Sequence, residues 1–276
     1  MRNLLLLFLG SVLLFGCNLV NPKEQIPTYL KIDSIAFSGG SHKITSAWVY
    51  YNNAPVGVFR LPATIPVLAD KAGSIQVGPG VTFDGFQDQQ SLYPFYAFDT
   101  FAITPAPGQV ITHTPSSKYT AVTHFPWKED FETGSDFHAY DSTVSTNVIV
   151  TTVDPNNVFE GYAAGMIHVT ASDTLSESAH NKPITIPSGQ SYLELDYKST
   201  VSFQVGLVAV DALGGTTKGY QVGIKAHSTW NKLYVGLQTF VGAHTGSTFY
   251  VIVRATLDNG QQDGYVWLDN LKVVSY

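Results

Sequence analysis

The stretch Leu193-Glu194-Leu195-Asp196-Tyr197 indicates the fold class, because apolar and acidic side chains alternate along it with a period of two residues. Successive side chains of a β-strand point to opposite faces, so such a stretch has one face for a core and one face away from it. Two further stretches repeat the alternation: Phe203, Val205, Leu207 and Ala209, and Phe249, Val251 and Val253. These runs predict an all-β chain.

Length and composition set the wider frame. The chain has 276 residues, and at roughly 100–150 residues per domain this length suits two domains. Hydrophobic residues make up 44% and charged residues 13%, which is enough apolar material for a packed core. The formal net charge of -6 and the absence of a dense basic run argue against a nucleic-acid partner.

The N-terminal segment is typical of an export signal. Met1-Arg2-Asn3 is cationic, and residues 4–14 form an apolar run that is too short for a membrane span of about 20 residues. Leu14-Phe15-Gly16-Cys17 resembles the bacterial lipobox. The alternative is an ordinary signal peptide with an incidental cysteine.

The lipobox resemblance implies a lipoprotein. Residues 1–16 would be the signal peptide, Cys17 would carry a covalent diacylglycerol, and residues 17–27 would tether the fold to the membrane. Asn18 after the cysteine favours an outer-membrane lipoprotein, facing the periplasm or the cell surface.

Residues 28–114 predict a first domain of short strands. Asn52-Asn53 lies between two β-rich runs and predicts a hairpin turn. The stretch Ala47-Trp48-Val49-Tyr50-Tyr51 and its continuation resemble the Ig-like or PEGA-type modules of exported proteins, which implies a small Ig-like sandwich. Residues 115–128 are expected to be a linker.

Residues 129–276 predict a second domain. It opens on Asp130-Phe131-Glu132-Thr133-Gly134 and closes on a strand with Leu268-Asp269-Asn270-Leu271. These two ends resemble the jelly-roll modules of the carbohydrate-binding and MAM/laminin-G-like group. The resemblance implies a jelly-roll β-sandwich whose first and last strands are neighbours.

The same resemblance implies a metal site. Related modules place a structural calcium ion between the matching Glu and Asp, which here are Glu132 and Asp269, and Asp130 could supply a third ligand. Carboxylate oxygens are the ligands that a hard cation prefers. The alternative is that these side chains cap turns or accept backbone hydrogen bonds.

Sugar-binding jelly rolls stack pyranose rings on exposed aromatic side chains. Tyr220, Trp230 and Tyr234 lie in the mid-domain strands and are therefore the expected ligand-binding residues. The alternative for each is a place in the core or at its rim.

Catalytic signatures are missing from the sequence. It contains no G-x-S-x-G, H-E-x-x-H, P-loop or G-x-G-x-x-G motif. Glu194 and Asp196 share a strand face at a spacing of roughly 7 Å, which suits glycoside hydrolysis, but the alternation favours a solvated outer face. The chain is therefore predicted not to be an enzyme.

These observations predict a cell-envelope lipoprotein that acts as a non-catalytic binding module for glycans. The alternative is a structural or adhesion subunit of an envelope protein assembly, bound to its partners through exposed strand edges.

Overall fold

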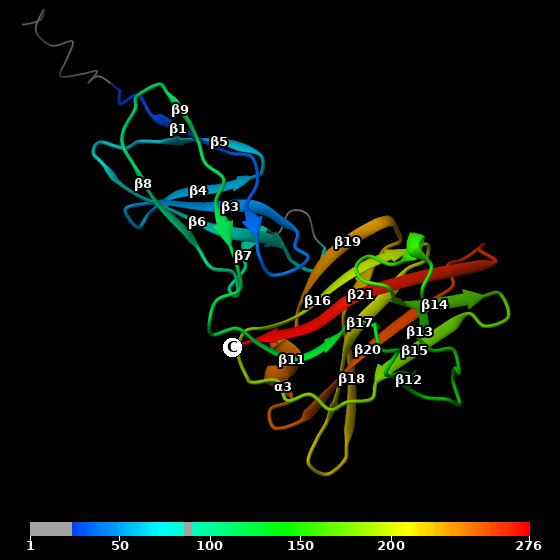
Figure 1. Cartoon of the computed structure of the whole chain (residues 1–276). Coiled ribbons are helices and arrows are strands. Elements are labelled where there is room, and N and C mark those ends of the chain that lie inside the picture. Colours follow the sequence, from blue (N-terminus) through cyan, green and yellow to red (C-terminus); the bar gives the residue numbers. More distant parts are fainter. Residues whose placement is uncertain (1–23, 86–89) are drawn as a thin grey trace, which may run out of the picture.

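The computed structural model describes residues 24–85 and 90–276, which form two β-sandwich domains joined end to end (Figure 1). The expected signal peptide, Cys17 and the tether as far as residue 23 lie outside the described residues. In the part of the chain that the structure describes, no helix is long and apolar enough to cross a membrane.

The first domain packs one three-stranded sheet against one five-stranded sheet. The three-stranded sheet has the order β5 (Ala63–Val67), β1 (Thr28–Ile32), β9 (Val110–Thr112), with β9 parallel to β1. The five-stranded sheet consists of β4 (Ala54–Arg60), β3 (Ile44–Tyr51), β6 (Gly73–Thr82), β7 (Gln90–Leu92) and β8 (Asp99–Ile103). Leu30, Ile65, Val49, Val77 and Ile103 fill the space between the sheets.

The predicted hairpin joins β3 to β4. Asn52 and Asn53 have φ angles of 48° and 66°, as a two-residue turn with both central residues in the left-handed region requires.

The expected linker over residues 115–128 is instead two strands. β10 (Ser116–Ser117) pairs with β2 (Ala36–Phe37) of the first domain, and β11 (His124–Glu129) pairs with the last strand of the second. The connection between the domains is thus shorter than expected, because both ends of this segment find backbone partners that lie far away in the sequence.

The second domain is a β-sandwich in which the chain passes repeatedly from one sheet to the other, as in a jelly roll. One sheet has the order β13 (Val150–Thr152), β14 (Ala164–Thr170), β21 (Asp263–Ser275), β16 (Ser191–Ser199), β19 (His227–Gly236), with β11 also beside β21. The other has the order β12 (Phe137–Ala139), β15 (Leu175–His180), β20 (Thr248–Thr256), β17 (Phe203–Val210), β18 (Thr216–Ile224). A 3₁₀ turn, η1 (Pro155–Asn157), and a six-residue helix, α3 (Gln238–Ala243), lie in the connections.

The core of the second domain confirms the predicted alternation. The side chains expected to face inward lie in one buried cluster: Leu193, Leu195, Tyr197, Phe203, Val205, Leu207, Ala209, Phe249, Val251 and Val253. At 25 cal/mol per Å² of apolar surface, each buried Leu, Val or Phe contributes about 1.5–3 kcal/mol of transfer free energy.

A third apolar cluster joins the domains. Val81, Tyr93, Phe95 and Tyr96 of the first domain pack against Tyr192, Tyr234 and Val274 of the second, and all seven are buried. The ring centroids of Tyr93 and Tyr192 lie 5.3 Å apart, and those of Tyr93 and Tyr234 lie 4.9 Å apart, both in edge-to-face geometry. The junction is therefore a buried cluster of aromatic and aliphatic side chains that both domains supply.

Candidate functional site

Glu194 and Asp196 face away from the core of the second domain, but the first domain covers them. Their residues are 0% and 1% exposed. The prediction of a solvated outer face is therefore wrong, because strand alternation shows which side chains face the core and not what packs on the opposite side. Buried in this way, the pair has no access to a substrate and is no glycosidase centre.

Both carboxylates belong to an interdomain ionic cluster formed by Tyr93, Tyr119, Glu194, Asp196, Lys232 and Lys272. The Tyr93 hydroxyl donates to Glu194 Oε1 at 2.7 Å, and the Tyr119 hydroxyl donates to Oε2 at 2.9 Å. The Lys232 and Lys272 ammonium groups each lie 3.5 Å from Glu194 Oε2, and Lys232 also lies 3.5 Å from Asp196. The Ser41 hydroxyl also donates to Asp196 Oδ2 at 2.5 Å, so two cations and three hydroxyls compensate the buried charge.

Tyr234 was predicted to bind a ligand at the surface, and this prediction is wrong because the residue is buried. It is 1% exposed, its hydroxyl accepts the backbone N–H of Lys43 at 2.9 Å, and it lies 3.1 Å from the Tyr96 hydroxyl. Burial and the Glu194 charge raise its pKa well above the usual value for a tyrosine. Tyr234 is a structural residue of the domain junction.

The first and last strands of the second domain are neighbours, as predicted. β11 lies antiparallel to β21, and Glu129 is opposite Leu271. This pairing brings Glu132, just after β11, and Asp269, within β21, to the same loop. That loop, residues 158–163, connects η1 to β14.

Backbone N–H groups of this loop bind both carboxylates. Glu132 Oε1 accepts from Tyr162 at 2.9 Å and from Ala163 at 3.2 Å. Asp269 Oδ2 accepts from Phe159 at 3.2 Å and from Glu160 at 3.1 Å. The loop must come close for these contacts, and a Cβ added to Gly161 between them would lie 2.1 Å from Glu132 Oε1.

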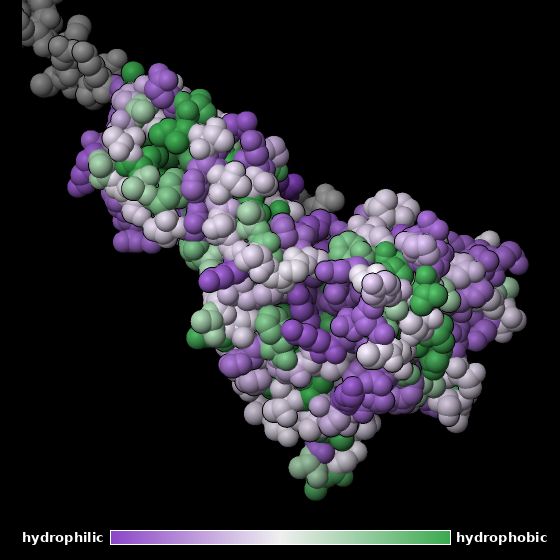
Figure 2. All heavy atoms as spheres, in the orientation of Figure 1, coloured by the Kyte–Doolittle hydropathy of each residue, from purple (hydrophilic) through white to green (hydrophobic). Residues whose placement is uncertain are grey.

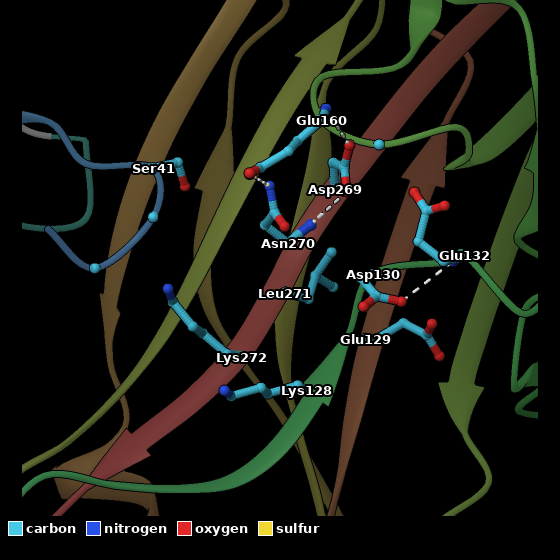
Figure 3. Close-up of a pocket in the computed structure, with 13 residues that line it drawn as sticks. Ser41, Lys128, Glu129, Asp130, Glu132, Glu160, Asp269, Asn270, Leu271 and Lys272 are labelled. Atoms are coloured by element: carbon cyan, nitrogen blue, oxygen red, sulfur yellow. Dashed lines mark hydrogen bonds between the residues drawn. The ribbon is translucent and has the colours of Figure 1, made fainter.

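A cavity of about 390 Å³ opens beside this seam, and Figure 3 shows its lining. Asp130 and Glu132 lie on one side, Glu160 lies above Asp269 and Asn270 below it, and Lys272 extends to the other side. Burial raises the pKa of Asp269 to about 6, although its backbone hydrogen bonds oppose this shift.

The structure does not bring the predicted metal trio together. Asp130 instead bonds within its own turn, where its Oδ1 accepts the backbone N–H of Glu132, two residues later, at 3.2 Å. In the described ranges, 24–85 and 90–276, the one set of three potential ligands with atoms within 4.8 Å of one another is Glu129, Asp136 and His180. The oxygen donors around Asp269 fit calcium by their chemistry, but Asp130 is not arranged as a ligand with Glu132 and Asp269.

The set of Glu129, Asp136 and His180 already contacts a positively charged side chain, that of Lys182. The Lys182 ammonium lies 2.5 Å from Asp136, and His180 Nε2 lies 3.4 Å from Glu129. Glu129 also accepts the backbone N–H of Phe131 at 2.9 Å. These contacts describe a structural ion-pair network at the start of the domain.

Tyr220 lies on the opposite sheet, whose outer side faces away from the core. Its hydroxyl donates to Glu177, and the Lys218 ammonium donates to both oxygens of Glu177 at 2.8 Å and 2.9 Å. Burial by itself would raise the pKa of Glu177, but the bonds from Lys218 and Tyr220 hold it below its usual range. The carboxylate therefore stays ionised beside a cation and an aromatic ring.

These residues form part of a polar and aromatic surface that we call the Glu177 face. Its members are Tyr140, Glu177, Gln204, Lys218, Tyr220, Tyr250 and Arg254. The Lys218 ammonium lies 4.7 Å from the centre of the Tyr140 ring. Tyr140, Tyr220 and Tyr250 are each partly exposed and pack on the buried side chains of Ala179, Val208 and Ile252.

A row across four strands ends in a hollow. Glu177 is opposite Arg254, Arg254 is opposite Gln204, and Gln204 is opposite Gly223. Gln204 and Gly223 line a cavity of about 260 Å³, and a Cβ added to Gly223 would meet nothing within 4 Å. Arg254 Nε is buried without a hydrogen-bond partner among the described residues.

Trp230 lies on the outer side of the other sheet, away from Tyr220. Its ring centroid is 5.4 Å from that of Phe159, and the Lys198 ammonium lies 5.8 Å from it. Lys198 is held in place by the Asn156 carbonyl at 2.7 Å. The three aromatic residues predicted for one glycan site thus occupy two faces and the domain junction.

Sequence reasoning missed Glu177, Lys218 and Arg254. Glu177 lies in Leu175–His180, where serines separate the charged and apolar residues, so no period-two signal marks its outer face. Lys218 follows the Gly214-Gly215 pair, which predicts a turn but indicates no binding residue. Only the order of strands β15, β20, β17 and β18 brings the three together.

No known protein family matches the sequence, and no curated protein matches it. Solved structures match the fold of the chain. The CBM22-1 xylan-binding domain from Paenibacillus barcinonensis Xyn10C is 12% identical, with a TM-score of 0.39 over 56% of this chain and 96% of that one. TmCBM61 in complex with β-1,4-galactotriose is 12% identical, with a TM-score of 0.35 over 52% of this chain and 92% of that one. The K3 cleaved adhesin domain of Lys-gingipain from Porphyromonas gingivalis is 14% identical, with a TM-score of 0.38 over 56% of this chain and 99% of that one.

Proposed function

We propose that this protein is a non-catalytic glycan-binding protein and that the Glu177 face holds the saccharide. The observation on which this rests is an ionised, nearly buried carboxylate on an open sheet surface, flanked by Lys218 and by the partly exposed rings of Tyr140 and Tyr220. A sugar offers the matching chemistry, because its C–H face packs on aromatic rings and its hydroxyls both donate and accept hydrogen bonds.

Each polar group has a defined part in this proposal. Glu177 receives three hydrogen bonds from Lys218 and Tyr220, and a carboxylate has about four acceptor positions, so one remains for a sugar hydroxyl. Arg254 Nε has an unused donor, and a buried donor without a partner costs about 1–3 kcal/mol. The hollow at the end of the row, lined by Gln204 and Gly223, has room for a further sugar hydroxyl.

The Glu177 face is proposed to bind a sugar without cleaving it, because it contains too few carboxylates for hydrolysis. Glycoside hydrolysis normally needs two carboxyl groups on either side of the scissile bond. Glu177 is the one carboxylate among the seven residues of the Glu177 face, and its lowered pKa does not suit a general acid.

The experiment is a glycan array with residues 24–276, followed by calorimetric titration of each hit. Xylan and β-1,4-galactan fragments, the kinds of ligand named for two of the compared structures, belong in the panel with other plant and bacterial polysaccharides. Glu177→Gln should weaken the hits, while Asp33→Asn, the same change at an exposed ion pair with Lys31, should not. No binding to any polysaccharide would refute the proposal.

The location and the metal belong to the same proposal. We place the protein at the outer membrane, held by diacylglycerol on Cys17 and facing the periplasm or the cell surface. We assign a structural calcium ion to Glu132 and Asp269, supported by the oxygen-rich cavity at the seam.

A second candidate is an adhesion subunit that pairs through β13. This strand is at the edge of its sheet. Val150 at its start is 45% exposed, and Val153 just after it is 73% exposed. In-cell crosslinking from position 151 would capture a protein partner if this candidate is correct, and the glycan array would then stay silent.

A further inference from the structure

The outer face of the three-stranded sheet in the first domain changes from polar to apolar along its strands. One row across the sheet is polar, because Lys31 of β1 is opposite Thr64 of β5 on one side and Thr112 of β9 on the other. Lys31 also forms an exposed ion pair with Asp33 at 3.2 Å. This part of the face is typical of a sheet surface in contact with water.

The next row toward the start of β1 is apolar. Tyr29 is opposite Pro66 of β5 and Val110 of β9. Val110 is 57% exposed, Pro66 is exposed and Tyr29 is partly exposed. Alternation places Leu68, two residues after Pro66, on the same side, and it is 59% exposed. Apolar side chains thus replace polar ones on the outer face at this end of the sheet.

Ile26 extends the apolar surface to the end of the domain. It is 61% exposed, and a Cβ added to Gly108 would lie 3.8 Å from its Cγ2. The backbone N–H of Gly108 donates to the Pro27 carbonyl at 2.9 Å, so Ile26 lies beside the turn that leads into β9. We call the following five residues the apolar tip: Ile26, Tyr29, Pro66, Leu68 and Val110.

The apolar tip has the character of a contact surface. Single exposed apolar side chains are common on proteins, whereas several at one place mark a surface that meets a partner. Figure 1 places β1, β5 and β9 at the end of the molecule that lies away from the second domain. Figure 2 shows hydrophobic atoms gathered on the same end.

The place of the apolar tip in the chain indicates which partner it meets. Ile26 follows Cys17 by nine residues, and at about 3.3 Å per residue this length spans at most about 30 Å. If Cys17 carries diacylglycerol, the tip is therefore held close to the bilayer. This step rests on the membrane anchor proposed above.

We propose that the apolar tip lies in the interfacial layer of the membrane, in contact with lipid, and directs the second domain away from the bilayer. Apolar surface moved out of water contributes about 25 cal/mol per Å². Tyrosine favours this layer because its ring is apolar and its hydroxyl is polar. Lys31, one row farther along the sheet, then lies on the water side.

The contact is hydrophobic rather than electrostatic. Glu24 and Asp70, which flank Ile26 and Leu68 in the sequence by two residues each, are exposed acidic residues that disfavour anionic lipid. The proposed partner is therefore a zwitterionic lipid surface, and high salt should leave the contact intact.

The test measures whether lipid reaches the tip. The full chain is produced in a bacterium that processes lipoproteins and is reconstituted in phosphatidylcholine vesicles that contain doxyl-labelled phosphatidylcholine. Cys17 is the one cysteine of the sequence, so a second cysteine provides the site for an environment-sensitive fluorophore. Labels on Leu68→Cys and Val110→Cys should shift to shorter wavelength and be quenched by the doxyl lipid. The control label on Val144→Cys, at a 59% exposed position of the second domain, should show neither change.

A charge at the tip provides the matched variant. Leu68→Asp, combined with the label on Val110→Cys, should abolish the quenching, because an unpaired carboxylate is costly to place in lipid. Leu213→Asp, the same change at a 97% exposed position of the second domain, should leave the quenching unchanged. Both variants should stay in the membrane fraction, since neither alters Cys17.

Four results would overturn the proposal. Tip labels that are not quenched while the protein stays in the membrane fraction would show that the tip lies in water. A spectral shift without quenching would show that a protein segment covers the tip. Equal quenching of the Val144→Cys label would show that the protein has no fixed orientation. Absence of the full chain from the membrane fraction would refute the anchor and the tip contact together. The glycan array with residues 24–276 needs no membrane, so failure of glycan binding is distinguishable from each of these results.

Discussion

The Tyr93 hydroxyl of the first domain donates a 2.7 Å hydrogen bond to Glu194 Oε1 of the second, and both residues are 0% exposed. A carboxylate removed from water in this way depends on every donor around it. Figure 2 shows hydrophilic atoms gathered on the second domain beside the first, around this junction. The two domains therefore share a single buried ionic cluster and are expected to unfold together.

Tyr93→Phe should reduce the free energy of unfolding by about 1–3 kcal/mol, because it leaves a buried charged acceptor with one donor fewer. Urea denaturation measures this change. Tyr51→Phe is the matched control, since its hydroxyl bonds the Lys71 carbonyl at the exposed surface and its loss should cost less than about 0.5 kcal/mol. Equal effects of the two variants would show that the Glu194 contact adds no stability.

Asp269→Asn should change the pH dependence of stability. The folded pKa of Asp269, about 6, lies above the value of 3.8 for an ordinary aspartate, so the folded state holds this proton more tightly. Raising the pH from about 4 to about 6 then removes stability through this group, and the loss stays constant above that window. In EDTA, the melting temperature of the wild type should fall relative to that of Asp269→Asn across this window. A constant difference between the two proteins would contradict the raised pKa.

Calcium removal should lower the melting temperature of the protein if the ion binds at Glu132 and Asp269. The ion requires an ionised Asp269, so the EDTA effect should grow as the pH rises above about 6. Asp269→Ala should abolish the sensitivity to EDTA. Asp130→Ala should retain it, because Asp130 turns toward the Glu132 backbone. A melting temperature that EDTA does not change would show that no stabilising calcium ion binds at Glu132 and Asp269.

Two substitutions of Tyr220 separate its ring from its hydroxyl. Tyr220→Phe keeps the aromatic surface and deletes one donor to Glu177, and we expect a loss of glycan affinity of about fivefold to tenfold. Tyr220→Ala also removes the ring and should weaken binding further, by about another tenfold. Titration with the strongest array hit measures both. Indistinguishable affinities of the two variants would show that the sugar does not contact the ring.

Strand alternation was sufficient to predict the interior of the second domain. Leu193, Leu195 and Tyr197 point inward because a sheet with one buried face tolerates no shift by one residue. The same alternation left the environment of Glu194 open, since a side chain on the outer face meets either water or another domain. Tyr93 and Tyr119 lie 101 and 75 residues away, and no local pattern connects them to it.

The candidate site was predictable only in part for a similar reason. Tyr220 was identified by residue type, and so were Trp230 and Tyr234, but the assignment of each strand to a sheet decides which side chains meet. β18 and β19 are consecutive in the chain and belong to different sheets, which separates Tyr220 from Trp230. For Glu132 and Asp269, the sequence left open whether they bind a metal or accept backbone hydrogen bonds. Both carboxylates accept backbone N–H groups of the loop over residues 158–163.

The buried Glu194 also limits how this chain is reused in protein engineering. The second sandwich by itself is not a self-contained cassette for fusion to another protein, because the first domain covers part of its outer face. Here the cassette would leave the host with an uncovered carboxylate and the bare rings of Tyr192 and Tyr234. A soluble fusion therefore needs both sandwiches, or a redesigned outer surface on β16 and β19.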